Sequence, residues 1–154
     1  MTLENTLVEK LSEWQPQPGR QELHVAEGGW SVTVAADRSD ALGCLLWDVT
    51  LRSQGGTDID VSKWAATAAE RVSGLMEALK VVEIDTARKE AQLRSESPRE
   101  RGEQRLYYEL LLRSREAVLR RYQTKVHSSH RDQIAFALTH EAVAKLVADL
   151  AASA

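Results

Sequence analysis

The sequence predicts an α+β protein: an antiparallel meander sheet, or two such sheets, with a central helix and with N- and C-terminal helices. An apolar stripe of helical spacing runs from Asp60 to Lys80, alternating apolar and polar residues lie on both sides of it, and a second helical stripe follows Thr139. A period of about 3.6 residues indicates a helix, and a period of about two indicates a strand. The expected order is helix, three strands, helix, four to five strands, helix, in one domain spanning residues 1–154.

The composition is that of a globular protein. Of the 154 residues, 43% are hydrophobic and 28% are charged, so the chain can bury a core without disulfides or metals and is not expected to be disordered. The net charge of −3 argues against a general nucleic-acid binder. The single cysteine, Cys44, excludes an intramolecular disulfide and a cysteine-based zinc cluster.

The expected location follows from two further features. Residues 1–10, MTLENTLVEK, lack the basic flank and the apolar centre of a signal peptide. No apolar run approaches the roughly 20 residues that a membrane-spanning helix needs. We therefore expect a cytoplasmic protein with no membrane association.

The central helix is the most clearly marked element. Asp60 suits its N-cap, where a carboxylate accepts hydrogen bonds from the first turn, and Ile59 is placed to pack on Trp64 as a hydrophobic staple. Small residues line its middle, among them Gly74, which costs about 1 kcal/mol relative to alanine in a helix. The predicted buried stripe consists of Val61, Trp64, Ala65, Ala68, Val72, Leu75, Met76 and Leu79.

Before the central helix, the pattern indicates one helix and three strands. Apolar residues from Leu3 to Trp14 have helical spacing, and the proline-rich segment 15–19 ends that helix. The strands are predicted at Glu22–Val25, Trp30–Ala36 and Ala41–Arg52. Alternation in the third strand places Leu45, Trp47, Val49 and Leu51 on one face. The opposite face changes from apolar to polar, so the strand is predicted to leave a doubly buried zone for a solvated one; its residues are Leu42, Cys44 and Leu46, then Asp48, Thr50 and Arg52.

After the central helix, a second run of strands is predicted. Val81–Thr86 and Ala91–Glu96 form a hairpin that turns around Arg88 and Lys89, and later strands are expected at Arg105–Arg113, Ala117–Val126 and Gln133–Leu138. In the strand Arg105–Arg113, alternation predicts two faces. The side chains that face the core are Leu106, Tyr108, Leu110 and Leu112, and those that face outward are Arg105, Tyr107, Glu109 and Arg113. The last helix is capped by Thr139 and buried through Val143, Leu146, Val147 and Leu150.

One stretch, residues 98–126, is open to two interpretations. The segment Ser97-Pro98-Arg99-Glu100 has the pattern of a capping box with proline at the first helical position. The first interpretation is therefore a long helix. Gly102 and scattered arginines interrupt every apolar face of such a helix, whereas the strand alternation is unbroken. The hairpin is therefore favoured and the helix remains the alternative.

The order of elements resembles the secretion-chaperone-like α/β fold of the type III secretion chaperone class, which comprises small acidic bacterial proteins. The resemblance covers most of the chain and is carried by element order, not by a motif. It implies a homodimer that holds an extended segment of a partner. The segments RLYYELLL, LRRYQ and IAFALTHEAVAKLV also look like parts of small bacterial proteins without an assigned activity.

Few residues have the spacing of a catalytic or metal site. His127 and His130 come nearest to a metal pair, but they fall in a polar loop, which favours a solvated role. Cys44 lies mid-strand among leucines without a positive neighbour, which favours a buried structural thiol. Glu83 and Asp85 have the spacing of a carboxylate pair, which a solvated strand face explains equally well. We expect no catalytic residue, no cofactor and no metal.

The best functional lead is the basic stretch 98–126, which contains eight Lys or Arg and four Glu. Arginine interleaved with tyrosine suits an acidic peptide or single-stranded nucleic acid. A solvated strand pair with cross-strand Glu–Arg pairs is the plainer interpretation. The residues expected to contact a partner are Arg105, Tyr107, Arg113, Arg120 and Tyr122.

These patterns favour a non-catalytic protein-interaction or chaperone-like module that presents a sheet face or edge to a protein partner. A homodimer is expected, because unprotected strand edges tend to be paired. The alternative is a nucleic-acid or anion-binding module that uses the Arg/Tyr hairpin 98–126, with nucleic acid disfavoured by the glutamates of that stretch. An enzyme is the least favoured class.

Overall fold

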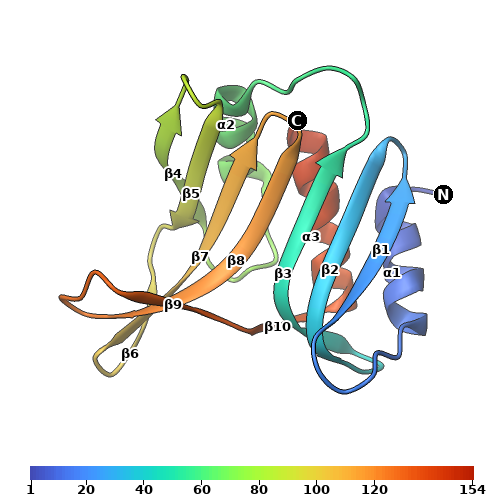
Figure 1. Cartoon of the computed structure of the whole chain (residues 1–154), viewed down its shortest axis with the longest axis horizontal. Helices are drawn as coiled ribbons and strands as arrows, with labels where there is room; N and C mark the ends of the chain where they lie inside the picture. The colour runs from blue at the N-terminus through green and yellow to red at the C-terminus, as the bar shows by residue number, and fades with distance from the viewer.

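The computed structural model describes residues 1–154 and contains one antiparallel sheet of ten strands with three helices (Figure 1). The main sheet has the order β1-β2-β3-β8-β7-β5-β4, and the short strands β6, β9 and β10 pair with β7, β8 and β3. The helices are α1 (Leu3–Glu13), α2 (Val61–Arg71) and α3 (His140–Ser153). The strands are β1 (Gln21–Glu27), β2 (Trp30–Ser39), β3 (Gly43–Ser53), β4 (Leu79–Asp85), β5 (Glu90–Ser95), β6 (Arg99–Arg101), β7 (Gln104–Arg113), β8 (Glu116–Lys125), β9 (Arg131–Ile134) and β10 (Phe136–Thr139).

The α+β class and the predicted order of elements are confirmed. The second run contains seven strands instead of four to five. The difference comes from short elements: β6 forms a hairpin with the start of β7, and the predicted strand Gln133–Leu138 is divided at Ala135 into β9 and β10. The turn that joins β4 to β5 lies where it was predicted, with Lys89 at a positive φ of 56°.

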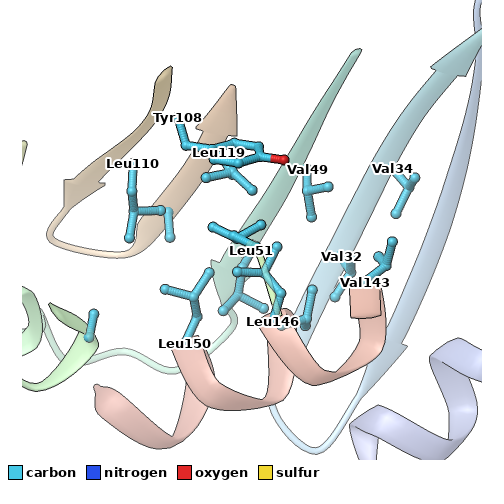
Figure 2. Close-up of a cluster of buried hydrophobic side chains, with 14 of the residues drawn as sticks. Val32, Val34, Val49, Leu51, Tyr108, Leu110, Leu119, Val143, Leu146 and Leu150 are labelled. Atoms are coloured by element: carbon cyan, nitrogen blue, oxygen red, sulfur yellow. The ribbon is translucent and has the colours of Figure 1, made fainter. Parts of the chain in front are cut away.

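All three helices pack against the same face of the sheet (Figure 1). We call the opposite side the helix-free face. The core is one cluster of 29 buried residues drawn from helices and strands alike, so the two halves of the chain share it. Figure 2 shows Val143, Leu146 and Leu150 of α3 directed toward the valines and leucines of the sheet. None of the helices is long and apolar enough to cross a membrane.

The predicted caps and the predicted anchor of the central helix are confirmed. The Asp60 carboxylate accepts hydrogen bonds from two backbone N–H groups of the first turn of α2, at 3.0 and 3.4 Å. Thr139 Oγ1 accepts from the backbone N–H of Ala142 at 3.1 Å and so caps α3. Trp64 is fully buried, and its indole Nε1 donates to the Leu150 carbonyl oxygen at 2.9 Å. Trp64 therefore ties α2 to α3.

The central helix is shorter than predicted. Val72 is its C-cap and is already extended, with ψ of 123°. The chain then passes through Gly74 at φ +92° and Met76 at φ +61°. A positive φ cannot continue a right-handed helix. The prediction of a helix over Asp60–Lys80 is therefore wrong beyond Val72.

Some residues of the predicted apolar stripe that lie beyond α2 are still buried in the core. Leu75 and Leu79 are each 4% exposed, from the loop and from the first residue of β4. Met76, predicted to be buried with them, is 99% exposed. The spacing thus predicts burial at two of these positions without predicting the backbone conformation.

Residues 98–126 form a hairpin and not a helix. β7 and β8 pair in continuous register from Gln104 opposite Lys125 to Arg113 opposite Glu116. Ser97 and Pro98, which suit a helix start in the sequence, lead instead into β6. The unbroken alternation was therefore the decisive signal.

β3 changes phase near its middle. The pairing of β2 with β3 slips at this point, and Trp47 has no partner in β2. The predicted doubly buried zone is therefore confirmed on one side only: Cys44 and Leu46 are buried, whereas Leu45 and Trp47 are half-buried. Leu42, predicted to be buried with Leu46, is 78% exposed. Past the irregularity the prediction holds, because Val49 and Leu51 face the core.

Candidate interaction surface

The candidate surface lies on the helix-free face, where β7 and β8 cross the centre of the sheet. Directly opposite residues of an antiparallel pair share a face. Tyr107 lies opposite Tyr122, Glu109 opposite Arg120, and the two ends of the hairpin follow the same alternation. The structure thus brings all the predicted partner-contact residues to this one face: Arg105, Tyr107, Arg113, Arg120 and Tyr122.

Two side chains predicted to point outward are nevertheless buried. Tyr107 and Glu109 are each 7% exposed, although they lie on the helix-free face. They are covered by Arg131 of β9, whose guanidinium lies 3.8 Å from the Tyr122 ring centroid and donates to the Tyr107 hydroxyl at 3.3 Å and to the Glu109 carboxylate. Sequence reasoning missed Arg131, because β9 follows a polar loop and its register with β8 leaves no local pattern.

Glu109 is the centre of an ion-pair network. Its carboxylate contacts Arg131 and lies 3.4 Å from Arg94 Nε on β5. Burial alone would lower the pKa of Arg131, but its hydrogen bonds to Glu109 and Tyr107 outweigh that effect and raise the pKa above its usual value. One carboxylate is thus shared between the guanidinium groups of Arg94 and Arg131.

The exposed arginines of this face also have carboxylate partners. Arg113 Nε lies 3.4 Å from Glu90, and Arg120 Nε lies 4.0 Å from Asp48. Burial raises the pKa of Asp48, while Arg120 opposes the shift. Exposed pairs of this kind each contribute about 0–1 kcal/mol to stability. Their larger effect is to balance the charge of the surface.

β4 is one of the two edge strands of the sheet, and no strand pairs with its outer side. Charges and bulges commonly blunt such edges, and β4 has both. It still exposes Val81, Val82 and Ile84 by 36%, 41% and 42%, which are three of the seven large hydrophobic side chains exposed by the protein. Glu83 and Asp85 lie on the same strand, and Asp85 accepts a backbone hydrogen bond from the following turn at 3.0 Å, a structural role.

The remaining candidates are not assembled into a site. Cys44 is 4% exposed, its Sγ lies 3.4 Å from Ser39 Oγ, and burial raises the pKa of its thiol, which makes it a weak nucleophile at neutral pH. His130 Nε2 lies 3.0 Å from Asp132 in an exposed loop. No three His, Cys, Asp or Glu side chains are arranged to hold a metal ion.

Fold and surface together define an α+β protein with one helix-covered sheet face, one charge-balanced helix-free face and an apolar edge strand. No protein-family model, no curated protein and no solved structure matches the chain. What bears on its function is therefore the chemistry of these surfaces.

Proposed function

We propose that the protein is a non-catalytic, chaperone-like interaction module that pairs with a second copy through β4 and presents its helix-free face to a protein partner. The observation that supports this best is the exposed apolar edge of β4. A second strand would bury those side chains and satisfy the free backbone groups. The resemblance of the element order to the type III secretion chaperone class, whose members form homodimers, points the same way.

Edge pairing would also create a larger binding surface. Two copies of one strand pair antiparallel about a two-fold axis perpendicular to the sheet. This symmetry places both helix-free faces on the same side of one continuous sheet. The surfaces around Tyr107 and Tyr122 of the two copies would then face one partner, and arginine and aromatic side chains are enriched in such interfaces.

Light scattering after size-exclusion chromatography tests the dimer. We expect the wild-type protein to have twice the 17.2 kDa mass of the chain. Ile84→Lys places a charge in the apolar edge, so we expect it to weaken dimerisation by about tenfold or more and to give the monomer mass, because an unpaired ammonium group is costly to bury.

Val126→Lys is the matched control for this variant. Val126 is 36% exposed, as Val81 is, but it follows β8 and does not belong to the edge strand. The Val126→Lys variant should leave the dimer intact. A wild-type monomer at high protein concentration, or equal dissociation by both variants, would contradict the proposal.

The second candidate function, nucleic-acid or anion binding by the helix-free side of hairpin 98–126, has weaker support. Its arginines already have carboxylate partners, for example Glu90 for Arg113. We expect no measurable binding of a mixed-sequence single strand at about 150 mM salt, because those carboxylates repel phosphate and compete for the guanidinium groups.

Fluorescence anisotropy at two salt concentrations measures this. Arg113→Glu is the diagnostic variant, and Arg88→Glu, in the exposed turn after β4, is its control. Submicromolar affinity that falls steeply with salt and is lost only in Arg113→Glu would place nucleic-acid binding first.

A further inference from the structure

A groove of about 850 Å³ is lined by residues on the helix-bearing side of the sheet and by the segment between α2 and β4. Its walls come from four separate segments: the loop before β4, the β6–β7 hairpin, β8, and the β9–β10 connection (Figure 1). No helix covers this part of the long β7–β8 hairpin. The volume lies within the range of about 300–1,000 Å³ that is usual for ligand sites.

The walls of the groove are mixed, and nine of the sixteen lining residues are hydrophobic. Leu106, Ile134 and Phe136 line it, and Phe136 packs edge-on against Tyr108 with ring centroids 5.5 Å apart. Met76 stands at its border with 99% of its surface exposed and with φ of +61°. A non-glycine residue in this conformation costs about 1–2 kcal/mol. Met76 is therefore an exposed apolar side chain held beside the groove at a cost in backbone energy.

The groove also carries positive charge that the protein itself does not neutralise. Arg99 and Arg101 alternate with Glu100 along β6, so both face the side of Leu106, while Glu100 faces the other side and pairs with Arg105 at 3.6 Å. Neither Arg99 nor Arg101 has a carboxylate within ion-pair distance, unlike the arginines of the helix-free face.

Arg121 adds a third, buried guanidinium to the wall. It is 7% exposed and lies 4.2 Å from the centroid of the Tyr108 ring. Its Nη2 is 3.0 Å from Glu77 Oε2, while Arg121 Nη1 and Glu77 Oε1 have no hydrogen-bond partner. With Glu77 counted against the three arginines, the groove keeps a surplus of two positive charges in a protein whose net charge is −3.

We propose that this groove binds a monomeric anionic amphiphile, namely a single-chain fatty carboxylate. The alkyl chain would lie against Leu106, Ile134 and Phe136, with Met76 closing over it, and the carboxylate would pair with Arg99 and Arg101 at the open end. The site lies on the opposite side of the sheet from the proposed partner surface. It does not depend on dimerisation at β4.

Isothermal titration calorimetry with decanoate, below its micelle-forming concentration, tests the proposal. We expect one decanoate per chain. Removing two methylene groups, as in octanoate, should weaken binding by about fifteenfold, because each buried methylene contributes about 0.8 kcal/mol. Decan-1-ol should bind more weakly than decanoate, since it cannot pair with the arginines. The Arg99→Gln/Arg101→Gln double variant should bind decanoate about five- to tenfold more weakly than wild type.

The chain offers a matched control, because Arg38 and Arg71 also have no ion-pair partner and lie outside the groove. Arg38→Gln/Arg71→Gln removes the same charge and should bind as wild type. Ile84→Lys should also bind as wild type, which separates this site from the dimer. Equal weakening by both double variants, no dependence on chain length, absence of decanoate binding, or binding only to anionic phospholipid vesicles would each overturn the proposal.

Discussion

Replacing Trp64 with alanine is expected to lower the free energy of unfolding by about 3–5 kcal/mol, a large part of the roughly 5–15 kcal/mol of a typical domain. Trp64 has no exposed surface, and its ring lies 6.2 Å from that of Trp30 on β2. Alanine would leave a cavity and would also leave the Leu150 carbonyl without its donor. Guanidinium denaturation followed by circular dichroism measures the change.

Two further variants separate the contribution of the buried Trp64 ring from that of its hydrogen bond and from the loss of any indole. Trp64→Phe retains most of the buried ring but removes the donor, so its loss should be intermediate. Trp47→Ala removes a half-buried indole that stacks on Arg20 at 3.8 Å, and we expect it to cost about 1 kcal/mol. A loss below about 1 kcal/mol for Trp64→Ala would show that α2 is not anchored through this side chain.

Gly43→Ala is expected to destabilise the protein by about 1–3 kcal/mol although it adds a single methyl group. A Cβ at this position would lie 2.5 Å from the Leu138 carbonyl oxygen and 3.1 Å from Thr139 Cα. Both contacts are with the backbone of β10, so no side-chain rotation relieves them. Since Thr139 caps α3, the displacement would reach that helix. Urea denaturation gives the free energy, and hydrogen exchange locates the disturbance.

Gly56→Ala is the control, because nothing lies within 4 Å of a Cβ built there and its φ is not positive. We expect it to leave stability unchanged or to raise it by up to about 1 kcal/mol, through a less flexible unfolded chain. If Gly43→Ala behaves like Gly56→Ala, β10 is not seated against β3 in solution.

The features that sequence predicts correctly here are local. Asp60 and Thr139 cap their helices with their own side chains, and alternation assigns the outward side chains of β7 to the correct face. The helical stripe through Leu75 and Leu79 misleads for a physical reason. Both residues are buried, but Leu75 lies in a loop and Leu79 begins β4, so their spacing of four residues comes from two separate segments and only coincides with the spacing of a helix face.

The parts of the candidate sites that escape prediction depend on distant pairing. Arg131 contacts Glu109 only because β9 pairs with β8, and no residue spacing in the sequence predicts the register of that pairing. The basic stretch 98–126 is also divided by the sheet. Its arginines at 105, 113 and 120 go to the helix-free face, whereas Arg99 and Arg121 go to the groove. Charge counted along the chain cannot show this division.

The pairing of β3 with β8 is expected to set the pace of folding. Arg52 and Glu116 face each other across this junction although 64 positions separate them. The meanders on either side can form from local hairpins, but joining them requires closure of a long loop, which is the slow kind of step. α3 then packs on α1, α2 and β3. During synthesis we therefore expect the N-terminal meander to keep the part of its apolar side that α1 does not cover exposed until residues 140–153 have been made.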